Sequence, residues 1–155
     1  MAKGGIKINL KGFDKMLEQL QEAGGDVSTA AASAIRESAK VVESELRAAA
    51  SESGVPSDIT SEIRAHTSSE GDRYEAEVGW QMGNYDPKKP SAGYKAVFLN
   101  YGTVKRYTKK GQYRGEITKP AQSQQFIHKA KKAARPKVKK IQQEILKKAL
   151  GDLEK

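Results

Sequence analysis

The sequence predicts an α+β fold in which a small, mainly antiparallel sheet is covered on one face by an Ala-rich helix, with a long amphipathic C-terminal helix beside it. Two segments, at about 6–10 and 74–80, alternate apolar and polar residues with the period of a strand. Two longer segments, at about 27–50 and 130–150, repeat apolar residues at every third or fourth position, which is typical of an amphipathic helix. The 155 residues are expected to form one domain, 1–155, with a core that is stable without disulfides.

The N-terminal elements follow from short apolar patterns. The first pattern predicts a strand with one buried face, made by Ile6, Ile8 and Leu10. Gly12 ends this strand, and a short helix is expected next because four apolar residues have helical spacing: Phe13, Met16, Leu17 and Leu20. Gly24 and Gly25 are expected to stop this helix, since glycine is common just past a helix C-terminus.

The next helix has the Ala-rich face. Asp26 is a suitable N-cap, because a carboxylate there accepts a hydrogen bond from a free N–H group of the first turn. The apolar face expected for this helix consists of Val27, Ala31, Ala34, Ile35, Val41, Val42, Leu46 and Ala49. Small side chains let another element approach closely, so the helix is expected to lie centrally and cover the strands. Gly54 and Pro56 end it.

The middle of the chain has one clear strand between less regular segments. For residues 58–69 two alternatives stay open: a helical turn, which the spacing of Ile59 and Ile63 favours, and a strand. The clear strand is predicted from the alternation of Tyr74, Ala76, Val78 and Trp80. Residues 96–101 are apolar enough to be buried, as a strand or as a short helix, and Gly102 is expected to take a positive φ.

Two long loops are expected, at about 81–93 and 103–125. Both segments are polar and contain Gly and Pro, which argues against a regular element inside them. For the second segment the alternative is a loose hairpin formed by Tyr107, Tyr113 and Ile117. Loops of this length in a compact domain are usually functional or become ordered on binding.

The last element is predicted to be an amphipathic helix from about 130 to 150. Its expected apolar face consists of Ala130, Ala134, Val138, Ile141, Ile145, Ala149 and Leu153. Pro136 either kinks this helix or begins its second half, because proline lacks a backbone donor and is best tolerated in a first turn.

Composition narrows the classes of function. Apolar residues make up 37% of the chain and charged residues 30%, which fits a domain that completes its burial against other subunits, although long helices would also explain it. The absence of cysteine excludes disulfides and thiolate sites, and the two histidines, His66 and His128, are too far apart in sequence to suggest a metal site. No run approaches the roughly 20 apolar residues of a membrane span, so a soluble protein is expected.

No motif predicts catalysis, and no catalytic, cofactor-binding or metal site is expected. The chain lacks a phosphate-binding Gly-x4-Gly-Lys-Ser/Thr loop, a Gly-x-Ser-x-Gly elbow and a His-Glu-x-x-His motif. Glu75 and Glu77 lie on one face of a predicted strand and suggest paired carboxylates, but a solvated strand face is the favoured interpretation. His128 has no visible partner that would orient it as a general base, so a surface position is favoured.

Positive charge is concentrated in the C-terminal segment. Residues 119–155 hold 11 Lys and Arg against 3 Asp and Glu, a net charge of +8 out of +9 for the chain. The candidate basic patch consists of Lys129, Lys131, Lys132, Arg135, Lys137, Lys139, Lys140, Lys147 and Lys148. Such a patch neutralises phosphates in a sequence-independent DNA-binding protein, with Tyr107 and Tyr113 as stacking partners. The other interpretations are a solvated face and contact with an acidic partner.

The order of several stretches along the whole chain resembles one known family. The stretches are Ile6 to Leu10 followed by Gly12-Phe13-Asp14 and a Leu-spaced helix; Ala30 to Ala50; Val55-Pro56; Glu77-Val78-Gly79; Tyr94 to Thr103, which ends in Gly-Thr; and the helix Ala130 to Leu150. The chain resembles the small head-to-tail joining proteins of long-tailed phages and prophages, called neck, tail-completion or minor tail proteins. Members often place the region equivalent to 58–69 in the sheet, and they usually have an acidic residue at the position of Asn100. They also have a Pro-Phe-hydrophobic-Pro-Ala entry to the last helix, where this chain has Ser123 to Ala130.

This resemblance implies a virion structural protein that assembles and does not catalyse. It implies a homo-oligomeric ring at the head–tail junction, built in the host cytoplasm, between the head connector or a head-completion protein and the tail terminator or tail tube protein. Packaged DNA passes through such a ring and is a further expected contact. The residues expected at subunit or partner contacts are Tyr94, Phe98, Tyr101, Gly102, Thr103, Tyr107 and Tyr113. The five aromatic residues among them belong to a class that is enriched at interfaces. For Tyr94, Phe98 and Tyr101 the alternative is a place in the core.

Overall fold

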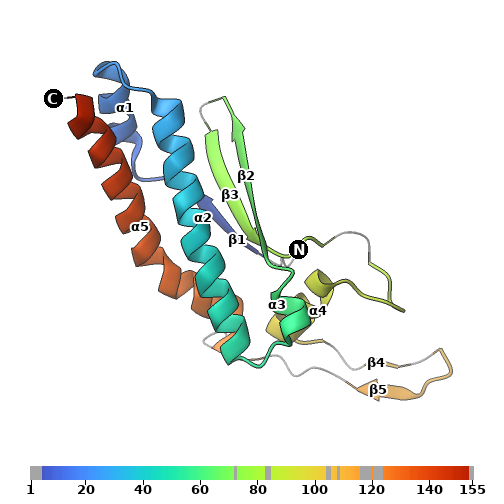
Figure 1. Ribbon diagram of the computed structural model, residues 1–155. Coiled ribbons are helices and arrows are strands. Elements are labelled where there is room, and N and C mark those ends of the chain that lie inside the picture. The colour runs from blue at the N-terminus through green and yellow to red at the C-terminus, as the bar shows by residue number, and fades with distance from the viewer. Residues whose placement is uncertain are drawn as a thin grey trace.

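The computed structural model describes residues 5–71, 73–82, 85–103, 106–107, 109–115, 120 and 124–153. The elements follow one another as β1 (Gly5–Asn9), α1 (Asp14–Glu22), α2 (Val27–Glu52), α3 (Ser57–Thr60), β2 (Arg64–Glu70), β3 (Arg73–Gly79), α4 (Ala92–Tyr101), β4 (Arg106–Tyr107), β5 (Tyr113–Gly115) and α5 (Phe126–Leu153) (Figure 1). The predicted α+β class is therefore confirmed. No helix among the described residues has the length and apolar character that a membrane span requires.

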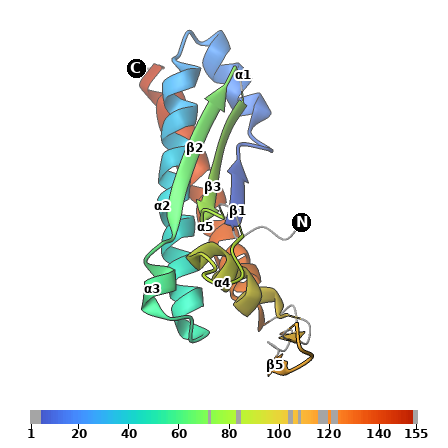
Figure 2. The same ribbon diagram turned by 90° about the vertical axis from the view of Figure 1, so that its right-hand side faces the viewer.

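The main sheet has three antiparallel strands in the order β1-β3-β2 (Figure 2). The register pairs Ile6 with Val78 and Ile8 with Ala76, so the apolar residues of both strands share one face. The opposite face is polar, and there Lys7 pairs with Glu77. Because side chains alternate along a strand, this register gives β1 and β3 one buried and one solvated face, as the sequence predicts.

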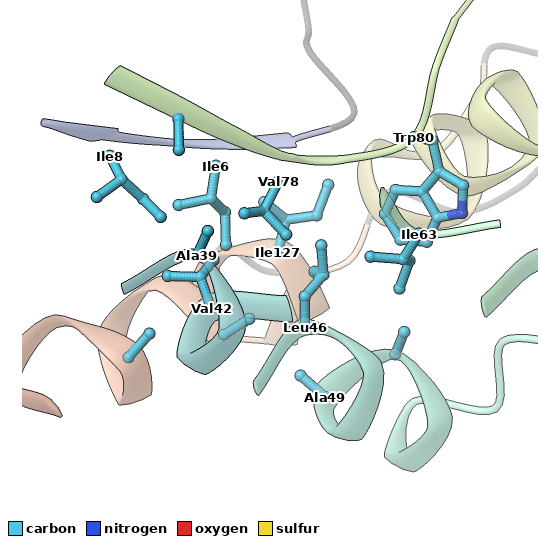
Figure 3. Close-up of a cluster of buried hydrophobic side chains, with 14 of the residues drawn as sticks. Ile6, Ile8, Ala39, Val42, Leu46, Ala49, Ile63, Val78, Trp80 and Ile127 are labelled. Atoms are coloured by element: carbon cyan, nitrogen blue, oxygen red, sulfur yellow. The ribbon is translucent and has the colours of Figure 1, made fainter. Parts of the chain in front are cut away.

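Helix α2 is the centre of the molecule. It lies between α5 and the sheet in Figure 1, and it packs against both. Its central side chains are fully or almost fully buried, and Figure 3 shows Ile6, Ile8 and Val78 pointing from the sheet toward Val42 and Leu46 of the helix. The small residues on its remaining buried positions let α5 approach closely. The prediction of a central, strand-covering helix is confirmed.

The start of α2 is capped as predicted. One carboxylate oxygen of Asp26 accepts a hydrogen bond from the Thr29 N–H at 3.0 Å, and the other accepts one from the Thr29 hydroxyl at 2.6 Å. The preceding helix α1 ends before Gly24, which has a φ of +80°. Since a positive φ is strained for residues with a side chain, glycine suits this turn between two helices.

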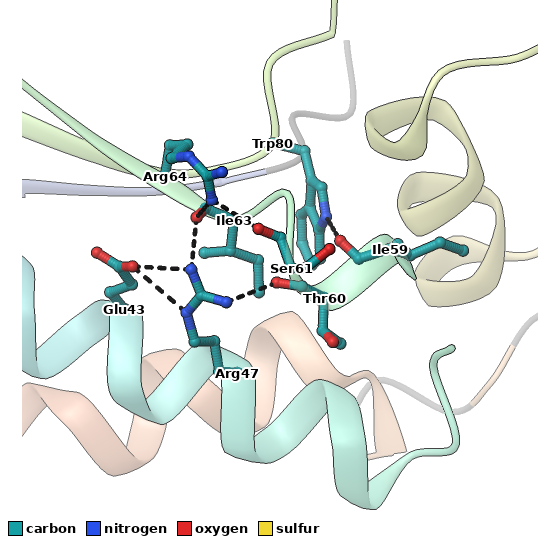
Figure 4. Close-up of polar contacts among 8 residues, drawn as sticks. All are labelled: Glu43, Arg47, Ile59, Thr60, Ser61, Ile63, Arg64 and Trp80. Atoms are coloured by element: carbon teal, nitrogen blue, oxygen red, sulfur yellow. Dashed lines mark hydrogen bonds and ion pairs between the residues drawn. The ribbon is translucent and has the colours of Figure 1, made fainter. Parts of the chain in front are cut away.

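The ambiguous segment 58–69 contains both alternatives in succession. Helix α3 is a single turn, and β2 begins four residues after its end. Arg47 of α2 fixes the junction, since its guanidinium donates to the carbonyls of Thr60 and Ile63 at 3.0 and 2.8 Å (Figure 4). The Trp80 indole N–H adds a bond to the Ile59 carbonyl at 2.7 Å. The chain thus leaves a helical turn and enters the sheet with the carbonyls of Ile59, Thr60 and Ile63 paired.

Residues 92–101 form a helix, and the helix begins two residues inside the segment predicted as a loop. Gly93 lies in its first turn, where a Cβ atom would come within 2.8 Å of the Gln81 carbonyl oxygen. Close packing of the backbone therefore sets this start. Gly102 follows the helix with a φ of +79°, which confirms the predicted positive φ.

In the described part of 103–125 the chain forms a hairpin, the alternative to an irregular loop. Strands β4 and β5 pair antiparallel, with Tyr107 opposite Tyr113. Ile117, the third residue of the predicted hairpin, lies outside the described residues.

Helix α5 is longer than predicted and runs through Pro136 without a break. Its buried face also differs from the predicted one: Gln142 and Leu146 are buried, Ile141 is half-buried, and Leu153 is 42% exposed. The buried residues Ala130, Ala134, Gln142 and Leu146 lie on rows four residues apart. A polar residue occupies this row because the Gln142 amide donates to the Asn9 carbonyl at 3.1 Å.

Candidate interaction surfaces

An aromatic cluster lies on the outer side of α4. The Tyr85 ring is 4.9 Å from the Tyr94 ring and 6.1 Å from the Phe98 ring, measured between centroids. Tyr94 and Phe98 are half-buried, and Tyr85 is 52% exposed. We call Tyr85, Tyr94 and Phe98 the aromatic cluster. Exposed aromatic groups of this kind suit a protein–protein contact, since they bury a large area at low entropic cost.

The predicted group of Tyr94, Phe98 and Tyr101 is divided between two environments. Tyr101 packs against the main core, whereas the other two face Tyr85. Tyr85 was not predicted as a site residue, because it stands alone in a segment rich in Pro and Gly. Only its contact with α4 identifies it.

Buried polar contacts hold α4 in place. The side chain of Asn100 is fully buried, and its Oδ1 accepts a hydrogen bond from the Ile127 N–H at the start of α5, at 3.0 Å. Its Nδ2 has no hydrogen-bond partner in the described part of the chain. The Ser91 hydroxyl donates to the Met82 carbonyl at 3.1 Å. The aromatic cluster is therefore tied through α4 to both the preceding segment and α5.

The remaining predicted contact residues follow α4. Gly102 and Thr103 are half-buried directly after the helix. Tyr113 begins β5 and is 56% exposed. Tyr107 lies opposite it in the hairpin register, and its side chain is outside the described part of the structure.

Five basic residues line a groove between β1 and α5. Lys131, Arg135 and Lys139 come from the helix, and Lys7 and Lys11 come from β1 and the turn after it. The groove has a volume of about 520 Å³ and an apolar floor made by Ile6, Ile8, Val42 and Val138. None of the described residues that line it is acidic. We call it the basic groove.

The other residues of the candidate patch lie elsewhere on α5. Lys137 forms an ion pair with Glu45 of α2. Lys129 and Lys132 lie beside His128, and Lys148 lies near Asp26 and Asp152 at the far end of the helix. Lys140 and Lys147 are exposed and do not line the groove. The positive charges are therefore spread around α5, and only three of the nine residues of the predicted basic patch line the groove.

The described side chains offer little support for a catalytic or metal site. No three His, Cys, Asp or Glu residues of the described chain come together as metal ligands. A Glu75 carboxylate oxygen lies 3.5 Å from the Lys7 Nζ, a cross-strand ion pair on the solvated face of the sheet, while Glu77 is exposed. The pKa of Asp26 is lowered from its ordinary value of 3.8, mainly because the Thr29 hydroxyl donates to the carboxylate, and this belongs to the helix cap.

Comparison with known proteins gives a family for the chain. Residues 14–102 match the HK97-gp10-like family, whose description is "Bacteriophage HK97-gp10, putative tail-component". The match covers more than half of the chain, from the start of α1 to the glycine after α4. The chain belongs to the HK97-gp10-like family. No curated protein and no solved structure matched the chain.

Membership in the HK97-gp10-like family confirms the resemblance to phage joining proteins and makes the chain a structural protein of a phage virion. Such a protein interacts with other virion proteins. The aromatic cluster falls within the matched residues, whereas β1 and α5, which form the walls of the basic groove, lie outside them.

Proposed function

We propose that this protein forms a homo-oligomeric ring at the head–tail junction, as a neck or tail-completion protein that joins the head connector to the tail. The observation on which the proposal depends is the match of residues 14–102 to a phage tail-component family. A closed ring needs heterologous contacts, in which one patch of a subunit meets a different patch of the next. The proposed partners are further copies of the chain, the head connector or a head-completion protein, and the tail terminator or tail tube protein.

The distribution of surfaces supports such contacts. The sheet has two outer strands, and all seven residues of β2 are exposed (Figure 2). The aromatic cluster lies on α4, near the end of the sheet where β1 begins (Figure 2). Three surfaces of different chemistry, namely an exposed strand, an aromatic cluster and a basic groove, would serve lateral and axial neighbours separately.

The hairpin is proposed to reach an axial neighbour. Strands β4 and β5 project away from the sheet and from α2 in Figure 1. Tyr113 is exposed on this projection, as a contact residue requires. Loops 81–93 and 103–125 would then dock on the rings above and below, while the helices would make lateral contacts.

The second candidate function is sequence-independent DNA binding, and the basic groove is the observation that favours it. Clustered Lys and Arg bind the DNA backbone with strong salt dependence. The ion pair between Lys137 and Glu45 and the apolar floor of the groove speak against it as the main function.

Electron microscopy of mixtures tests the proposed function. The purified chain would be added to tail-less, DNA-filled heads and, separately, to isolated tails, with connector-less heads as the control. New ring-shaped density at the connector or at the head-proximal end of the tail is the expected result. Absence of density from both particles, together with salt-sensitive binding to duplex DNA, would favour the second candidate.

A further inference from the structure

Strand β1 is an outer strand with an open side. In the order β1-β3-β2 it has a hydrogen-bonded neighbour on one side only, and Figure 2 shows no strand label on its other side. About half of the N–H and C=O groups of an outer strand point away from its neighbour and are able to pair with an added strand. Within the described residues, Gln142 caps the carbonyl of Asn9 at the end of β1.

The basic groove beside β1 gathers cations that have few counter-charges. Lys7 has an ion-pair partner in Glu75, but Lys11, Lys131, Arg135 and Lys139 have none among the described residues. Cations gathered without counter-charges favour an anionic occupant. An acidic ligand would neutralise both sides of the groove, since Lys11 lies in the turn after β1 on one side and Lys131, Arg135 and Lys139 lie on α5 on the other.

The floor of the groove identifies the class of ligand. Ile6, Ile8 and Val42 are buried and Val138 is half-buried, so the floor presents apolar side chains. A nucleic-acid backbone would satisfy the charges but would leave this floor and the open backbone groups of β1 without partners. An extended peptide whose inward-facing side chains, every second residue, include both acidic and apolar groups would match the cations, the floor and the strand at once.

We propose that the basic groove binds an extended acidic segment of another virion protein, which adds a strand to β1. The proposal rests on the proposed function for the identity of the partner, and it deepens that function by naming the contact. Since β1 and α5 lie outside the residues that match the family, the groove proposal is argued from the surface of this chain and not from the match.

Binding of a model peptide tests the site. The full-length chain would be titrated with a fluorescent peptide about eight residues long, in which every second residue is in turn Glu and Val and the residues between them are Ser. The groove variant is Lys131→Gln, Arg135→Gln, Lys139→Gln, and the control variant is Lys132→Gln, Lys140→Gln, Lys147→Gln, which removes the same charge outside the groove. We expect binding to weaken by about tenfold or more in the groove variant and to stay within about twofold in the control. Circular dichroism and urea midpoints would establish that both variants are folded.

Backbone methylation separates strand addition from simple charge attraction. A peptide of the same sequence with N-methylated alternate amides keeps every charge but cannot donate along the strand, so it is expected to bind at least about tenfold more weakly. Equal binding of the two peptides would overturn the proposal. So would an absence of peptide binding, or a groove that instead binds short duplex DNA and loses it in the groove variant.

The two proposals can fail separately. Wild-type protein that adds to heads or tails but does not bind the peptide would overturn the groove proposal alone. Peptide binding that depends on the groove, without addition to either particle, would overturn the junction proposal alone.

Discussion

At the scale of single residues, Asn100 joins two distant helices through one buried atom. Its Oδ1 accepts from the Ile127 N–H, one of the donors that a helix N-terminus leaves free. Its Nδ2 is buried without a partner in the described chain, and a buried unpaired donor is costly. The residue therefore stabilises the start of α5 and at the same time retains an unfavourable group.

These two opposing effects predict which of two substitutions of Asn100 destabilises the fold more. Asn100→Leu removes the acceptor and leaves the Ile127 N–H buried and unpaired, which should lower the free energy of unfolding by about 1–3 kcal/mol. Asn100→Asp keeps an acceptor at the positive end of the helix and removes the unpaired donor, so it should cost less. Urea unfolding at neutral pH would measure both. A larger loss for the Asp variant would mean that desolvation of the carboxylate outweighs the cap.

Asp26 predicts a dependence of stability on pH. Its pKa is lowered in the folded chain, mainly by the hydrogen bond from the Thr29 hydroxyl. A lowered pKa stabilises the fold above the ordinary value of 3.8, and this contribution is lost as the pH falls through the folded pKa. Asp26→Asn keeps an N-cap acceptor without the titration. The urea midpoint of this variant should therefore change less than that of the wild type between about pH 5 and about pH 2, a range that spans the titration of an ordinary Asp. Identical profiles would contradict the assignment.

At the scale of elements, Arg47 connects α2 to the segment that enters the sheet. Arg47→Leu leaves the carbonyls of Thr60 and Ile63 without their donors and should lower the free energy of unfolding by about 1–3 kcal/mol. Arg36→Leu on the same helix is the matched control, because Arg36 is exposed and its ion-pair distance to Glu37 is 3.9 Å. Urea midpoints of the two variants would be compared. Equal losses would show that the contacts of Arg47 with the α3–β2 junction contribute nothing.

The elements that sequence reasoning predicts best are those with a long, regular pattern. Strand β1, helix α2 and strand β3 follow from periodicity, and the Asp26 cap follows from residue type. Helix α4 could not be predicted from periodicity, because its sequence mixes Tyr, Val and Phe with Ala and Leu. Its helical form depends on buried contacts of Gly93 and Asn100. Such contacts join residues far apart in the chain and leave no local signal.

The candidate surfaces were harder to predict than the elements. The basic residues of α5 are visible in the sequence, but the sequence does not give the face on which each one lies. The groove exists because α5 packs beside β1, with Gln142 bonded to the carbonyl of Asn9. The aromatic cluster depends likewise on the return of Tyr85 onto α4. Both surfaces are products of tertiary packing.

At the scale of the whole molecule, the packed body and the projecting hairpin are expected to have separate roles. The core runs through α2, α5 and the main sheet, whereas β4 and β5 pair with each other in a second sheet. Figure 1 shows the hairpin at one end of the molecule, away from α1. The organisation of all 155 residues as one domain stays a prediction, and within it the hairpin is the part whose removal should disturb the core least.

Removal of the hairpin should therefore abolish addition to heads or tails without destabilising the core. Replacing 108–115 with a short Gly-Ser linker should leave the urea midpoint nearly unchanged, because β4 and β5 pair with each other in a sheet of their own, and no residue from 109 to 113, whose burial the structure describes, belongs to the core cluster. The same variant should no longer add density to heads or tails, because Tyr113 and its strand would be missing. A control that replaces only 109–112 keeps both strands and should still join, since the turn residues there are exposed. Normal addition by the variant without a hairpin would show that the docking contact lies elsewhere, with the aromatic cluster on α4 as the next surface to change.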